Sequence, residues 1–93
     1  MFRITFHENS NGVHMRIEGR LASEFAEEAK KSIVRRNLPA PLVVDLSEVT
    51  FADCNGEQAL SWLRALGARF VAENAYSLYL CERLQLPLLA VVS

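Results

Sequence analysis

Residues 43–56 read Val43-Val44-Asp45-Leu46-Ser47-Glu48-Val49-Thr50-Phe51-Ala52-Asp53-Cys54-Asn55-Gly56, and an apolar-periodic run from Glu57 to Phe70 follows them. The pattern predicts a short buried strand over Leu42 to Leu46, an acidic loop after it, and a helix that starts where the loop ends. The first N–H groups of a helix have no partner within the helix, and the helix dipole favours an anion there. Such a junction often forms a recognition site.

Apolar residues at three- and four-residue spacing give the predicted helix one buried face. That face is expected to hold Ala59, Leu60, Leu63, Leu66 and Phe70. Gly67 lies inside this helix, where glycine costs about 1 kcal/mol relative to alanine, and it leaves room for close packing. We expect Trp62 to be partly buried, and Arg64 and Arg69 to lie on the solvated face.

The N-terminal residues predict a β-hairpin. Two short runs alternate apolar with polar residues, and their apolar members are Phe2, Ile4 and Phe6, then Val13, Met15 and Ile17. Between the runs, Asn9-Ser10-Asn11-Gly12 favours a turn, because Asn and Gly tolerate positive φ. Gly19 is expected to end the second strand.

A first helix is predicted after Ser23, which can cap it. Acidic residues come early in this segment and basic residues come late, which matches the helix dipole. Its buried stripe is expected to contain Ala22, Phe25, Ala26, Ala29 and Ile33. Pro39 and Pro41 prevent its continuation.

Tyr76 to Leu80 is predicted to be a further strand. The tail from Cys81 to Val92 is open between a short helix from Pro87, which we prefer, and a strand over Leu88 to Val92. The resulting order β-β-α-β-α-β-(α) predicts one α/β domain over residues 1–93. It has a mixed sheet of about four strands, helices packed on it, and right-handed parallel crossovers.

Composition excludes several classes of function. The 93 residues are 51% hydrophobic and carry a net charge of −1, so no basic field supports binding to nucleic acid. No apolar run approaches the roughly 20 residues that cross a bilayer, and no signal peptide is evident. We therefore expect a cytoplasmic protein without direct membrane insertion. Cys54, Cys81, His7 and His14 lack the spacing of a disulfide framework or zinc site, so we expect no metal and no cofactor.

Three short motifs resemble the STAS family, the sulfate transporter and anti-sigma factor antagonist domains. They are Gly19-Arg20-Leu21, Asp45-Leu46-Ser47 and Asp53-Cys54-Asn55-Gly56. In that family the last motif is roughly Asp-Ser-Ser-Gly, and a partner kinase phosphorylates its first serine. The resemblance runs from about Ile4 to Leu80 and implies the STAS fold, with a short final helix. It also implies a non-enzymatic module of bacterial signal transduction and transcription regulation, whose loop contacts a switch kinase or another regulator.

The resemblance places the partner-binding site at Asp53, Cys54, Asn55, Gly56 and Glu57. Cys54 occupies the position of the phosphoacceptor, and neither a thiol nor the amide of Asn55 normally serves a serine kinase. Phosphorylation would add a charge of about −1.5 to −2 at the interface. Without that switch, we expect the chain to behave like a permanently dephosphorylated antagonist or to be regulated in another way. Glu57 also departs from the family, which usually has an apolar residue there.

Alternatives to this interpretation stay open. Asp53 or Asn55 can simply cap the helix, with Gly56 in a tight turn and Cys54 as a small filler. Some STAS domains are accessory subunits of transporter ATPases, including lipid transporters. Cys54 can also act as a redox-sensing thiol, because a helix N-terminus stabilises a thiolate, although adjacent Asp53 opposes this. A thiol-dependent enzyme ranks last because no general base is evident. His7 and His14 are expected to be a solvated surface pair.

Overall fold

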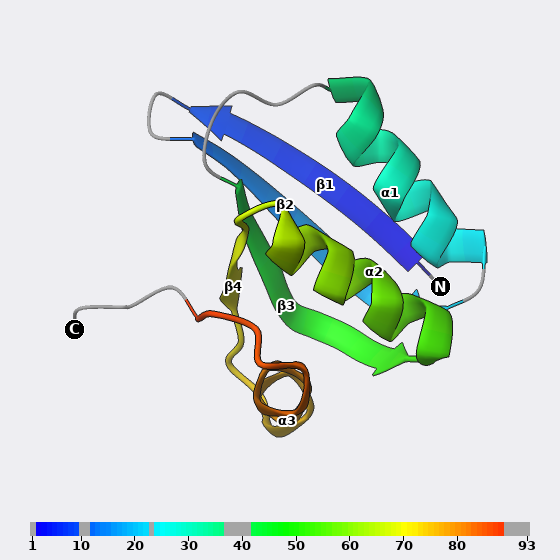
Figure 1. The fold of residues 1–93 in the computed structure, drawn as a ribbon, viewed down its shortest axis with the longest axis vertical. Coiled ribbons are helices and arrows are strands. Elements are labelled where there is room, and N and C mark those ends of the chain that lie inside the picture. Colours follow the sequence, from blue (N-terminus) through cyan, green and yellow to red (C-terminus); the bar gives the residue numbers. More distant parts are fainter. Residues whose placement is uncertain (1, 10–11, 23, 37–41, 89–93) are drawn as a thin grey trace.

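The computed structural model describes residues 2–9, 12–22, 24–36 and 42–88. Its elements are β1 (Phe2–Asn9), β2 (Gly12–Leu21), α1 (Glu24–Arg36), β3 (Leu42–Ala52), α2 (Cys54–Ala65), β4 (Arg69–Val71) and α3 (Ala75–Leu84). The strands form one mixed sheet in the order β1-β2-β3-β4, and α1 and α2 lie side by side across one of its faces (Figure 1). The predicted α/β class with a mixed sheet of four strands is confirmed, and the first five elements follow in the predicted order, whereas the last strand and the last helix lie at other residues than predicted.

The opening hairpin is confirmed, because β1 pairs antiparallel with β2. β2 then runs parallel to β3, and β3 runs parallel to β4. The prediction that Gly19 ends β2 is wrong, since the strand continues to Leu21. The pairing with β3 shifts register beside Gly19, whose φ of 91° only glycine adopts at little cost, so the strand absorbs a bulge there and goes on.

The prediction of a short β3 followed by an acidic loop is wrong. β3 has 11 residues, and the supposed loop from Ser47 to Ala52 is its second half. Along β3 the buried residues Leu42, Val44 and Leu46 alternate with half-exposed ones. This alternation is typical of a strand with one face covered by helices. The prediction that both faces of this strand are buried is therefore wrong.

In α1, Ala29 and Ile33 are buried as predicted, whereas Ala22 precedes the helix and is half-buried. Ser23, Pro39, Pro41, the side chains of Phe25 and Ala26, and turn residues 10–11 lie outside the described residues. Among the described helices, none is long and apolar enough to span a bilayer.

The prediction that α2 reaches Phe70 is wrong, although Ala59, Leu60 and Leu63 are buried as expected. The helix ends at Ala65, Leu66 is 55% exposed, and Phe70 is a fully buried residue of β4. Gly67 causes the stop through its φ of +92°: its N–H donates to the Arg64 carbonyl (2.9 Å), and the Ala68 N–H donates to the Leu63 carbonyl (3.2 Å). This Schellman end satisfies carbonyls of the last turn. A Cβ on Gly67 would meet no atom within 4 Å, so close packing is not its role.

The predicted strand over Tyr76 to Leu80 is also wrong, because these residues belong to α3. Asn74 caps the helix by accepting from the Ser77 N–H (2.8 Å), and the Asn74 N–H donates to the Ser77 hydroxyl (3.3 Å). This capping box starts a helix that buries Leu80 and Cys81. No helix starts at Pro87 within the described tail: the Phe70 N–H donates to the Pro87 carbonyl (2.9 Å), and Leu88 bridges Phe70 in parallel. Residues 89–93 lie outside the described range.

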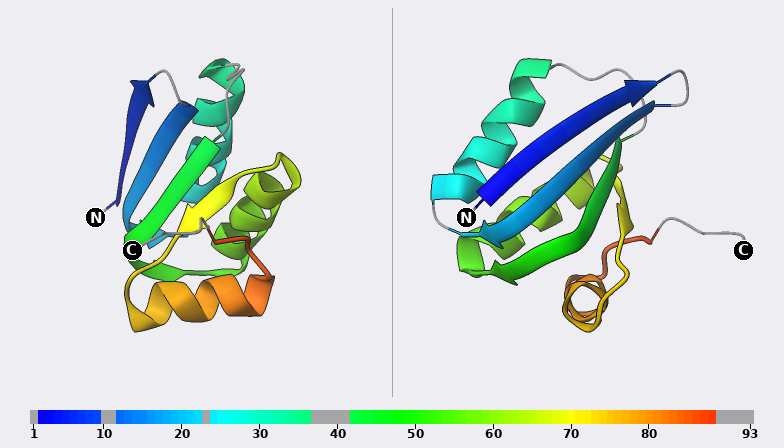
Figure 2. Two further views of the ribbon diagram at one scale, coloured as in Figure 1. Left: turned by 90° about the vertical axis from the view of Figure 1, so that its left-hand side faces the viewer. Right: turned by 180° about the vertical axis from the view of Figure 1, so that it is seen from behind.

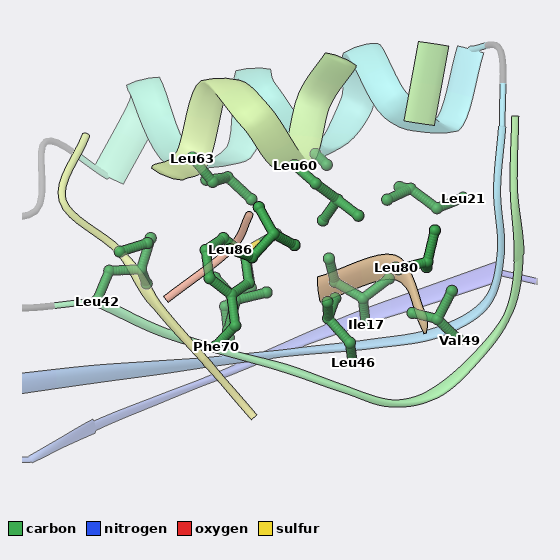
Figure 3. Close-up of a cluster of buried hydrophobic side chains, with 14 of the residues drawn as sticks. Ile17, Leu21, Leu42, Leu46, Val49, Leu60, Leu63, Phe70, Leu80 and Leu86 are labelled. Carbon is green, nitrogen blue, oxygen red and sulfur yellow. The ribbon is translucent and has the colours of Figure 1, made fainter. Parts of the chain in front are cut away.

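The core lies between the sheet and the three helices. Figure 3 shows buried side chains of the sheet, α2 and α3 meeting, among them Ile17, Leu46, Leu60, Leu63, Phe70 and Leu80. Trp62 is partly buried against this core and Arg64 is exposed on α2, as predicted. Arg69 is exposed too, but it lies in β4 and not on the helix face predicted for it.

α3 has a second structural role at the edge of β3. Of the residues of β3, β4 pairs with Val43, Val44 and Asp45, and α3 lies beside the remaining part of β3 (Figure 1). Two of its side chains bond to that edge: the Asn74 amide donates to the Ser47 carbonyl, and the Ala52 N–H donates to the Tyr76 hydroxyl (2.8 Å). A helix thus covers backbone groups that a longer β4 would otherwise pair.

Candidate protein-interaction site at the start of α2

Asp53 joins β3 to α2 without an intervening loop. Its backbone is extended (φ −87°, ψ −171°), its carboxylate accepts from the Gly56 N–H (2.8 Å), and its carbonyl accepts from the Glu57 N–H (2.8 Å). Asp53 is therefore the N-cap, and the sequence analysis predicted that either Asp53 or Asn55 has this role. The predicted recognition loop over residues 53–56 is the N-cap and first turn of the helix itself.

Gly56 brings this first turn against the end of β2. A Cβ at position 56 would lie 2.0 Å from the Leu21 carbonyl oxygen and 3.3 Å from the Ala52 Cβ. The Asp53 N–H also donates to the Leu21 carbonyl (3.3 Å). The segment Gly19-Arg20-Leu21 and the segment 53–56, which are far apart in the sequence, therefore meet backbone to backbone, and this contact fixes where α2 begins.

Cys54 and Asn55 are exposed at the first two positions of α2. Their neighbours on both sides are engaged, since Asp53 caps the helix and Gly56 is buried against Leu21. The two side chains are thus presented to solvent by a backbone that is bonded to β2. These two side chains are therefore accessible to a second molecule.

Glu57 is less accessible than the sequence interpretation supposed. Its side chain is 19% exposed and forms an ion pair with Arg83 in the last turn of α3. α3 therefore neutralises the charge that departs from the family pattern. Arg83 has no role in the sequence analysis, which assigns that segment to the tail. The signal that could have found it is the capping pair Asn74 and Ser77, because it starts a helix whose last turn contains Arg83.

A further contact near the site was not foreseen. The Arg20 guanidinium lies 4.9 Å from the centroid of the Phe51 ring, and the two residues are paired across β2 and β3. Phe51 is 40% exposed, and the cation covers part of its ring. This cation–π contact lies next to Leu21 and Ala52 and adds an aromatic surface at the same end of the sheet.

The remaining candidates lie elsewhere. Cys81 is buried in α3, and this burial raises the pKa of its thiol. His7 and His14 face each other across β1 and β2, and both are exposed. In the described part of the chain, no group of three or more His, Cys, Asp or Glu side chains is arranged to hold a metal ion.

Comparison with known proteins gives the class of fold. No family model matches the sequence, and no curated protein matches it. Among solved structures, the chain is similar to the anti-sigma factor antagonist SpoIIAA in its unphosphorylated form, with a TM-score of 0.63 and 13% identity, over 99% of this chain and 90% of that one. It is also similar to an uncharacterized protein of the DUF3478 family with a SpoIIAA-like fold from Shewanella loihica PV-4. That match has a TM-score of 0.60 and 8% identity, over 88% of this chain and 75% of that one.

The chain is therefore a STAS-like domain in its fold. The four-stranded mixed sheet, the opening hairpin and the helices on it match the SpoIIAA-like arrangement that the sequence motifs implied. At this level of identity the likeness is one of fold alone.

Proposed function

We propose that this chain is a non-enzymatic, protein-binding regulatory module of the anti-sigma factor antagonist type, which acts in bacterial cytoplasmic signalling. The partner is a switch kinase or another anti-sigma regulator, and the contact surface is the first turn of α2, with Asp53, Cys54, Asn55, Gly56 and Glu57. The observation that carries this proposal is the exposure of Cys54 and Asn55 on a helix start that is bonded to the end of β2. A preorganised surface loses little conformational entropy when a partner binds.

Cys54 determines how the module is regulated. Its thiol takes the place of the serine hydroxyl that accepts phosphate in the family, so the usual off-switch is absent. The binding-competent state is then constitutive with respect to phosphorylation at this position. A negative charge at residue 54 should still act as the family's phosphate does, because it would stand at the partner interface.

The test is capture of partners from the native lysate by the tagged chain and two variants. Cys54→Asp adds a charge, whereas Cys54→Asn is the matched control of nearly the same size without one. We expect a switch kinase or anti-sigma regulator to be captured by the native chain and by Cys54→Asn, and to be lost with Cys54→Asp.

Two outcomes would overturn the proposal. Capture of such a regulator by all three proteins alike would show that binding does not use the start of α2. Capture of a membrane transporter ATPase instead, with no effect of the aspartate, would favour the accessory-subunit function.

A further inference from the structure

The chain's two histidines lie directly opposite each other in the hairpin. His7 of β1 and His14 of β2 are partners in the antiparallel register, and both are exposed. Their neighbours Phe6 and Met15 point into the helix-covered side, where Met15 is fully buried. The two imidazoles therefore project from the same, helix-free face of the sheet, which is turned toward the viewer in the right-hand panel of Figure 2.

This geometry points to a two-histidine chelate for a borderline divalent transition-metal ion such as Ni²⁺, Cu²⁺ or Zn²⁺. Directly opposite residues of an antiparallel pair have Cβ atoms about 4.5–5.5 Å apart. Imidazole nitrogens bind such ions at about 2.0–2.1 Å, so two nitrogens bound to one ion are roughly 3 Å apart, and two facing imidazoles reach that separation by rotating about χ1 and χ2. Imidazole is a preferred ligand for these ions, and water completes the coordination sphere at an open site.

The surroundings permit a cation at this position. His14 is also in register with Val43 of β3, which is uncharged. The next pair along the hairpin on this face is Thr5 and Arg16. Arg16 therefore lies one pair away from the two histidines. Its guanidinium forms ion pairs with Glu18 (3.2 Å) and Glu48 (3.5 Å), which compensate its charge.

Binding would have a structural consequence. Among the described strands, β1 lies at the edge of the sheet and pairs with β2, so an ion held by both histidines would join the two strands. The site is near the start of β2, whereas the surface proposed for partner binding adjoins Leu21 at its end. The chelate is therefore independent of the proposed function.

The test is a calorimetric titration of the protein with NiCl₂ at pH 7.5, in a Cys54→Ser background that removes the exposed thiol as a competing ligand. The sequence contains two histidines, so the single variants His7→Asn and His14→Asn test the site completely. We expect one ion per chain, and a loss of affinity of at least about tenfold in either variant, because even outer-shell partners of a metal contribute that much. The ion should also raise the Tm of the parent protein and leave the Tm of both histidine variants unchanged.

Three results would overturn the inference. One is no heat of binding and no change in Tm in the parent protein. Another is binding that survives in either single variant, which would mean that the histidines act separately. The third is one ion per two chains with a dimer in sedimentation, which would mean that the histidines of different molecules are bridged. Circular dichroism of both variants checks that each still folds.

Discussion

At the scale of single residues, Gly56 is the most constrained position of the candidate site. We expect Gly56→Ala to destabilise the protein by about 1–3 kcal/mol or more, the usual cost of forcing an extra carbon into a packed interior. The added Cβ would lie 2.0 Å from the Leu21 carbonyl oxygen, a backbone atom that cannot rotate away. Urea unfolding measures the change, and Ala65→Gly at the other end of α2 is a control that alters helix propensity without a clash. Equal losses in the two variants would contradict the steric argument.

Asp53 is expected to contribute through its cap. Asp53→Ala removes the acceptor of the Gly56 N–H, and losing an N-cap of this kind costs about 0.5–2 kcal/mol. Asp53→Asn is the matched control, because its amide oxygen can accept the same bond while the charge is lost. If Asn proves as destabilising as Ala in urea unfolding, then the charge and not the cap is what matters at this position.

At the scale of the elements, Gly67 and the capping box of α3 explain why two predictions went wrong. The apolar spacing of Leu63, Leu66 and Phe70 continues the helical pattern, and only the positive φ of Gly67 ends the helix. Residues 76–80 are rich in aromatic and apolar residues and resemble a strand locally, whereas Asn74 and Ser77 start a helix. Periodicity within a window of this length does not distinguish these cases, and the turn chemistry at its ends does.

The role of Gly67 can be tested by one substitution. Gly67→Ala is expected to cost about 1–2 kcal/mol, because a residue with a Cβ is strained at a φ of +92° even though nothing obstructs the Cβ itself. Gly67→Asn should cost less, since asparagine tolerates the left-handed region better. Thermal unfolding of both variants provides the measurement, and a neutral or stabilising alanine would show that the helix can extend past residue 67.

The bond between α3 and the edge of β3 can be tested by a pair of tyrosine variants. Tyr76→Phe removes the hydroxyl that accepts from the Ala52 N–H and leaves a buried donor unpaired, which costs about 1–3 kcal/mol. Tyr79 stacks on Tyr76 with ring centroids 6.4 Å apart but is 54% exposed, so Tyr79→Phe is the control and should be nearly neutral. Hydrogen exchange at Ala52 should quicken in the first variant only. Unchanged exchange there would mean that water replaces the tyrosine hydroxyl.

At the scale of the whole molecule, the sequence predicted the α/β class, the hairpin and a helix N-terminus at residues 53–56. It did so because alternation in β1 and β2 and the motif at Asp53 are local signals. It did not predict that Glu57 meets Arg83, that Gly56 abuts Leu21, or that His7 is opposite His14 in register. Each of these contacts joins segments through tertiary packing or strand register, which local patterns do not specify.

We expect the burial of Cys81 to make the free energy of unfolding fall as the pH rises in the alkaline range. Burial raises the pKa of this thiol in the folded protein above its value in the unfolded chain, so between the two values the folded state holds more protons. The stabilisation is complete below the unfolded pKa, near the ordinary thiol value of about 8.5, and is lost as the pH rises through the folded pKa. Urea midpoints measured from pH 7 to 10.5 should therefore fall with rising pH.

Two cysteine variants test whether Cys81 causes this dependence. Cys54→Ser, which alters an exposed thiol, should keep the dependence, whereas Cys81→Ala should weaken it, whatever its effect on stability at pH 7. A slope that survives in Cys81→Ala would assign the alkaline dependence to other groups.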